Sequence, residues 1–137
     1  MEKVFKFMML SIALCSGMQA KAQDDGYDVF VPIAKYISQG DAAKLSAWFA
    51  DNLEISIVSG TNDSSKKQAR QILSSFFESH TPRSFTISHR ASRANMKYVL
   101  GTLNAGGESY LVTIFMNYKD NGYQIQQFKI ERTSSVY

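Results

Sequence analysis

Residues 108–132, ESYLVTIFMNYKDNGYQIQQFKIER, have the pattern of one long β-hairpin. Apolar and polar side chains alternate on both sides of Asn121-Gly122, and these two residues favour a type I′ turn because both tolerate a positive φ. With Asn121 and Gly122 as the loop, Tyr118 would pair with Ile125. This stretch therefore predicts two long antiparallel strands around which the rest of the chain is arranged.

The alternation in the second strand breaks at Gln126-Gln127. One extra residue there, a β-bulge, restores a continuous apolar face and bends the hairpin toward it. The pairs predicted beyond this bulge are Met116 with Phe128, Ile114 with Ile130 and Val112 with Arg132. The concave face would then carry Tyr110, Val112, Ile114, Met116, Tyr118, Ile125, Phe128 and Ile130. We expect this face to form one wall of the core.

The first 22 residues have the pattern of a signal peptide. Lys3 and Lys6 form a basic start, residues 7–15 are an apolar stretch, and Ala20 and Ala22 place small side chains where a signal peptidase reads them. The apolar stretch is too short to span a bilayer stably, so a retained membrane helix is disfavoured. We therefore expect export to the periplasm or the exterior.

Cleavage before Gln23 would leave residues 23–137 as a single domain with no stable membrane span. A lipid anchor on Cys15 is disfavoured, because Leu14 stands where a small residue is expected. Cys15 is the only cysteine, so the exported domain would have no disulfide, no thiol nucleophile and no thiolate metal site.

Charge and motifs exclude further classes. The chain has a net charge of +3, which falls to about +1 without the targeting segment, so no global field attracts nucleic acid. With His80 and His89 as the only histidines, a histidine-rich metal site is not expected. No phosphate loop, dinucleotide fingerprint or nucleophile elbow occurs, so the sequence predicts no cofactor and assigns no catalytic residue.

Before the hairpin, apolar spacing predicts three helices and three strands. The first helix is capped by Asp28 and ends at Gly40. The second is short, follows Asp41 and carries Leu45, Trp48 and Phe49. The third is long and amphipathic, is capped by Asp63 or Ser64, and stops before Thr81-Pro82. The strands cover 53–59, a stretch from 84, and 96–104, with a loop at 60–65. The order α-α-β-α-β-β-β-β predicts an α+β fold, in which a strongly bent antiparallel sheet wraps around a long amphipathic helix.

The turn after residue 104 leaves two alternatives open. An even loop places Val99 and Leu103 on the concave face, and an odd loop places Met96, Tyr98 and Leu100 there.

This order of elements and the bulged terminal hairpin resemble the nuclear transport factor 2-like superfamily, a cone-shaped fold that includes ketosteroid isomerases and polyketide cyclases. The signal peptide, residues 31–41, residues 45–49 and residues 97–132 look like the exported bacterial family catalogued as domain of unknown function 4783. The resemblance implies the cone fold and is nearly silent on activity. An isomerase would need acidic residues in the cone, and the predicted concave face has no Asp or Glu, so that activity is not expected.

The candidate pocket residues are Tyr36, Trp48, Phe76, His89, Tyr110, Met116 and Phe128. They could enclose a small apolar or amphipathic ligand, or they could simply fill the core, because large aromatic side chains fill a cone of this size efficiently. His89 follows Phe85 and Ile87 on the predicted concave face, where it could act as a base or hold a carboxylate, or be an ordinary rim histidine. His80 is expected to face the carbonyl end of the third helix.

The outer face of the hairpin carries Leu111 and Phe115, which predicts an exposed apolar patch and a homodimer or another protein contact. Lys66, Lys67 and Arg70 form a basic cluster that is either a solvated face or a contact for an anionic envelope component. Three hypotheses follow: a non-catalytic exported domain with a ligand in the cone, an interaction module that uses the outer face, and an enzyme that uses His89 with a tyrosine.

Overall fold

The computed structural model describes residues 28–58 and 60–133. The signal peptide predicted for residues 1–22, with Cys15, and the tail 134–137 lie outside the described residues. The described elements are α3 (Phe30–Gln39), α4 (Ala42–Ser46), β1 (Phe49–Ile57), β2 (Gly60–Ser65), α5 (Lys66–Ser79), β3 (Pro82–Arg93), β4 (Met96–Ala105), β5 (Glu108–Lys119) and β6 (Gly122–Arg132). No helix within these residues is long and apolar enough to cross a membrane.

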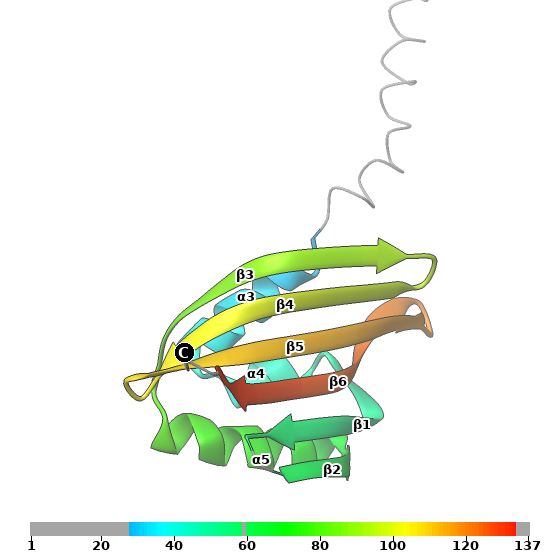
Figure 1. The fold of residues 1–137 in the computed structure, drawn as a ribbon. Helices are drawn as coiled ribbons and strands as arrows, with labels where there is room; N and C mark the ends of the chain where they lie inside the picture. The colour runs from blue at the N-terminus through cyan, green and yellow to red at the C-terminus, as the bar shows by residue number, and fades with distance from the viewer. Residues whose placement is uncertain (1–27, 59, 134–137) are drawn as a thin grey trace, which may run out of the picture.

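The strands form one curved sheet, and the helices lie behind it in the view of Figure 1. The strand order is β2-β1-β6-β5-β4-β3, with β1 parallel to β6 and every other neighbouring pair antiparallel. The predicted α+β class is therefore confirmed. The predicted order of elements is wrong in one place, because it lacked strand β2. The predicted sheet was antiparallel throughout, whereas β1 and β6 are parallel. In place of one long enclosed helix, three helices contribute to the packing, and α5 is the longest of them at 14 residues.

Strand β2 replaces the loop predicted for residues 60–65. Its residues are turn formers by type, yet the stretch pairs with β1 from Gly60 opposite Ile57 to Ser65 opposite Asn52. An edge strand pairs through its main chain on one side, so polar side chains that remain in water do not prevent pairing. Strand β1 also begins at Phe49, before the predicted start, because α4 ends at residue 46.

The β5–β6 hairpin has the predicted bulge but a different turn. Asp120 and Asn121 form its loop, with φ angles of 52° and 68°. Gln126 has no partner in β5, where the register shifts between Phe115 and Met116. The predicted register is wrong by two residues: the pairs beyond the bulge are Ile114 with Phe128, Val112 with Ile130 and Tyr110 with Arg132. A shift of two preserves the alternation, so the predicted concave face still holds.

The β4–β5 turn settles the parity that the sequence left open. Gly106 and Gly107 form a two-residue loop, and both have positive φ. The even loop places Val99 opposite Ile114 and Leu103 opposite Tyr110, and all four side chains are fully buried. The concave face of β4 is therefore the one that carries Val99.

Local signals end or begin the helices. Gly40 ends α3 with a φ of 69°, and the Asp41 side chain caps α4, as predicted. Helix α5 is capped by Ser65, whose hydroxyl accepts from Gln68 N at 3.1 Å while the Gln68 side chain accepts from Ser65 N at 3.2 Å. The predicted cap at Asp63-Ser64 is wrong, because those residues remain paired in β2.

Candidate functional site

Most of the candidate pocket residues are packed together as a core. Phe76, Tyr110, Met116 and Phe128 are buried in one hydrophobic cluster, and Tyr36 and Trp48 pack against it half-buried. The Tyr110 ring meets the Phe76 ring edge to face, with centroids 5.3 Å apart. None of the four principal grooves on the described residues is lined by any of the seven candidates. Four of these six residues are therefore core residues, and Tyr36 and Trp48 lie at the edge of the core.

His89 lies on the opposite face of the sheet from its predicted place. Ile87 pairs with Gly101 and His89 pairs with Leu100, so Ser88 is an extra residue in β3. This bulge reverses the alternation: Ile87 packs half-buried against the core, whereas His89 is exposed. The predicted concave position of His89 is therefore wrong, and the residue does not meet the core tyrosines.

The histidine that meets a core tyrosine is His80. Its ring stacks on Phe76 at 4.5 Å and stands edge to face against Tyr110 at 5.9 Å. The His80 Nδ1 atom lies 3.2 Å from the Phe76 carbonyl oxygen, which confirms that His80 faces the carbonyl end of its helix. Sequence reasoning missed the pair, because no periodicity connects a helix end to a strand 30 residues later.

The Tyr110 hydroxyl is buried and has no hydrogen-bond partner among the described residues. Burial raises its pKa above the ordinary value, the Glu108 charge and the approach of the Glu108 side chain to the hydroxyl raise the pKa further, and Arg132 lowers it. Glu108 and Arg132 form an exposed ion pair, and the Arg132 guanidinium lies 5.8 Å from the centre of the Tyr110 ring. The phenol therefore stays protonated at neutral pH, so it can donate a hydrogen bond but cannot act as a base.

The described residues around Tyr110 do not form a metal-binding cluster. Within residues 28–58 and 60–133, no group of three or more His, Cys, Asp or Glu side chains is placed to hold a metal ion. His80 and Tyr110 lie against a packed core, and Glu108 points to the ion pair with Arg132 at the surface.

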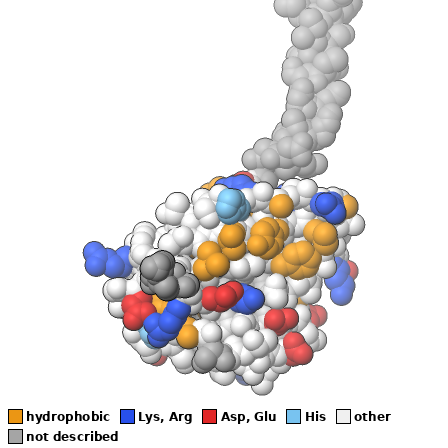
Figure 2. Space-filling view, in the orientation of Figure 1, with side chains coloured by type: hydrophobic (Ala, Val, Ile, Leu, Met, Phe, Trp, Pro, Cys, Tyr) orange, Lys and Arg blue, Asp and Glu red, His pale blue; other side chains and the backbone are white. Residues whose placement is uncertain are grey.

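The outer face of the sheet carries an apolar surface. We define the outer patch as Tyr98, Leu100, Leu111 and Phe115, all half-buried. Tyr98 pairs directly with Phe115, and Leu100 lies diagonal to both Leu111 and Phe115 across the β4–β5 ladder. Figure 2 shows hydrophobic side chains gathered over the region of β4 and β5. The two predicted partner-face residues therefore share a face with two further apolar side chains, Tyr98 and Leu100.

Charged side chains flank the outer patch asymmetrically. Arg93 lies at the β3–β4 hairpin and is paired with Met96 on the same face. At the opposite edge of the sheet, Glu54 of β1 is paired with Asp63 of β2 on the same outer face. In Figure 2, acidic side chains lie below the patch over β6, β1 and β2, and a basic side chain lies at the β3–β4 end. On the outer face, Arg93 therefore lies at the β3 edge and the acidic pair Glu54 and Asp63 at the β2 edge, with the Lys129–Glu131 ion pair of β6 between that pair and the outer patch.

Together, the curved mixed sheet and the helices on its concave side give the chain a nuclear transport factor 2-like fold. A designed protein of this type has a TM-score of 0.65 at 15% identity and covers 80% of this chain and 98% of that chain. The chain belongs to the DUF4783 family, a domain of unknown function whose family model matches residues 30–131.

Solved structures of the same family share the fold. The DUF4783 protein from Bacteroides uniformis ATCC 8492 has 23% identity and a TM-score of 0.72, covering 75% of this chain and 95% of that one. The DUF4783 protein from Bacteroides ovatus ATCC 8483 has 21% identity and a TM-score of 0.72, covering 75% and 94%. No curated protein matches the chain. These likenesses show the fold and the family and assign no activity.

Proposed function

We propose that the protein is a non-catalytic association module that forms a homodimer through the outer patch. The observation that carries the proposal is an apolar surface on the face of the sheet away from the helices, while most of the candidate pocket residues are buried in the core. Export, inferred from residues 1–22 alone, would place this dimer in the periplasm or outside the cell.

Apolar burial supplies the driving force in this proposal. Half-exposed Tyr98, Leu100 and Phe115 form a cluster of two aromatic rings and an aliphatic side chain at the centre of the patch. Aromatic residues at the centre of a patch are the usual energetic anchors of protein interfaces, and polar groups around them form the rim. Thr113 and Gln127, beside the patch, can supply that rim.

Charge asymmetry favours a second copy of the chain as the partner. A twofold axis lying in the interface and parallel to the strands would place Arg93 of one protomer against the acidic edge of the other. An axis perpendicular to the strands would instead place each edge of the sheet against the same edge of the partner, so Arg93 would not meet the acidic pair. The arrangement therefore fits an isologous dimer in one orientation, with Arg93 facing Asp63 of the second protomer.

Analytical ultracentrifugation over a range of protein concentrations tests the proposal. We expect the protein to be a dimer that dissociates on dilution, and Phe115→Glu to be a folded monomer at every concentration. Thr86→Glu is the matched control, because it adds the same charge to the outer face on β3, away from the outer patch. A monomer at every concentration, or equal dissociation by both variants, would exclude this interface.

The orientation has its own test. Arg93→Asp should weaken the dimer, and Asp63→Arg in the same chain should restore it, because the charge pair is re-formed with its signs exchanged. If the second change weakens the dimer further, the strand-parallel axis is wrong.

A further inference from the structure

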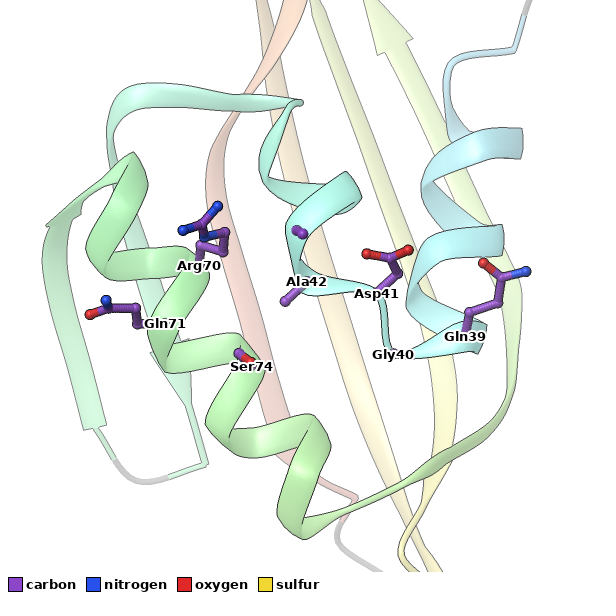
Figure 3. A pocket seen from close by; sticks show the side chains of 8 residues that line it. Gln39, Gly40, Asp41, Ala42, Arg70, Gln71 and Ser74 are labelled. Atoms are coloured by element: carbon purple, nitrogen blue, oxygen red, sulfur yellow. The ribbon is translucent and has the colours of Figure 1, made fainter.

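A polar groove of about 550 Å³ lies between the α3–α4 turn and α5, on the helical side of the molecule. Small residues, Gly40, Ala42 and Ala43, line it together with Arg70 and Ser74 of α5. In Figure 3, Arg70 on α5 and Asp41 in the turn lie on opposite sides of Ala42. The floor of the groove thus consists of small side chains, and the oppositely charged Arg70 and Asp41 lie on its two sides.

The main chain fixes the shape of this groove. Gly40 has a φ of 69°, and a Cβ added there would come within 3.1 Å of Pro82, so the turn depends on glycine. Ala69 and Leu73 bury their side chains in the core, which turns Arg70 and Ser74 outward along the groove. The floor and both walls are therefore formed by packed elements.

The two charges that line the groove are not neutralised by each other. One oxygen of Asp41 accepts from Lys44 N at 3.0 Å in the α4 cap, and its second oxygen makes no hydrogen bond within the part of the chain that the structure describes. Arg70 is exposed and makes no ion pair with any described residue. A purely anionic ligand would meet the repulsion of Asp41, and a purely cationic one would meet that of Arg70.

We propose that this groove binds the zwitterionic backbone of a short peptide, with the carboxylate on Arg70 and the ammonium on Asp41. A guanidinium binds a carboxylate through two parallel hydrogen bonds, and the free Asp41 oxygen accepts from an ammonium. Ser74 lines the same groove and can bond to the peptide group between the two ends. Small side chains on the floor leave room for the peptide main chain. The groove is separate from the outer patch, so this proposal does not depend on the dimer.

A titration of the ¹⁵N-labelled protein with diglycine, followed by amide chemical shifts, tests the proposal. We expect saturable shifts at the amides of Ala42, Ala43 and Arg70. N-acetyl-diglycine lacks the ammonium and diglycine amide lacks the carboxylate, so each should bind about tenfold more weakly. The absence of saturable shifts with diglycine, or equal binding of all three probes, would overturn the proposal.

Substitutions that preserve the local structure test whether Arg70 binds the carboxylate and Asp41 binds the ammonium. Arg70→Gln preserves helix propensity and should weaken diglycine binding about tenfold, whereas Lys67→Gln, one turn away, should leave it unchanged. Asp41→Asn preserves the N-cap of α4 and should weaken binding of diglycine but not of N-acetyl-diglycine. An equal loss in the Lys67 and Arg70 variants would show a diffuse charge effect and would refute the site.

Discussion

Replacing Tyr110 by phenylalanine should stabilise the protein. The Tyr110 side chain is fully buried, and its hydroxyl has no hydrogen-bond partner among the described residues. A buried polar group left unpaired costs about 1–3 kcal/mol, and phenylalanine fills the same space against Phe76 and His80 without that cost. We expect Tyr110→Phe to raise the free energy of unfolding by about 1 kcal/mol, measured by urea denaturation, and the melting temperature by about 4–8 °C.

The same substitution should change how stability depends on pH. Below pH 10, the ordinary pKa of tyrosine, the phenol is protonated in both states and contributes no pH dependence. Above that pH the unfolded chain loses the proton, while folded Tyr110, with its raised pKa, retains it. The unfolded state then binds fewer protons, so the free energy of unfolding falls as pH rises. Tyr110→Phe should lessen this alkaline loss.

Tyr118→Phe is the matched control, because Tyr118 is 46% exposed and its hydroxyl reaches water. We expect that variant to change the free energy of unfolding by less than about 0.5 kcal/mol. If Tyr110→Phe instead destabilises the fold by about 1 kcal/mol or more, the hydroxyl has a partner and the reasoning fails. An alkaline loss equal to that of the original protein would refute the pH argument separately.

Two further substitutions test local structure. Ser65→Ala removes the capping box of α5 and should lower the free energy of unfolding by about 1 kcal/mol in urea denaturation, whereas Ser65→Asp should retain the cap. A Cβ at Gly101 would lie 2.7 Å from the Phe85 ring and 2.8 Å from the Thr86 carbonyl oxygen, so Gly101→Ala should cost about 1–3 kcal/mol by calorimetry. Gly122→Ala meets no atom within 4 Å and should cost much less; equal losses at both glycines would contradict the packing of β3 on β4.

The sequence predicted those features of the fold that rest on alternation. The concave face of the terminal hairpin and its bulge follow from side-chain pattern, and both are present. The turn was misplaced because Asp120, Asn121 and Gly122 are three consecutive turn formers, and sequence alone does not choose between the two dipeptides they contain. Strand β2 was missed because it pairs with β1 through its main chain, and its polar side chains lack the apolar alternation by which a strand is predicted.

The candidate site was less predictable than the fold. A bulge at Ser88 moved His89 to the outer face, and serine in that position gives no sign of an extra residue. The contact between His80 and Tyr110 depends on where the end of α5 meets the sheet, which is a property of the assembled chain. The predicted Leu111 and Phe115 share one face of β5, as the alternation of that strand implied.

The parallel pairing of β1 with β6 has a consequence for synthesis. Of the described strands, β6 is synthesised after all the others, and it lies between β1 and β5 in the sheet. Without β6, no hydrogen-bonded strand connects β1 and β2 to β3–β5 in this sheet. Contacts such as Ile55 with Phe128 span 73 residues, and contacts of long sequence separation form slowly. A chain that stopped before residue 122 would therefore lose the strand that joins its two halves.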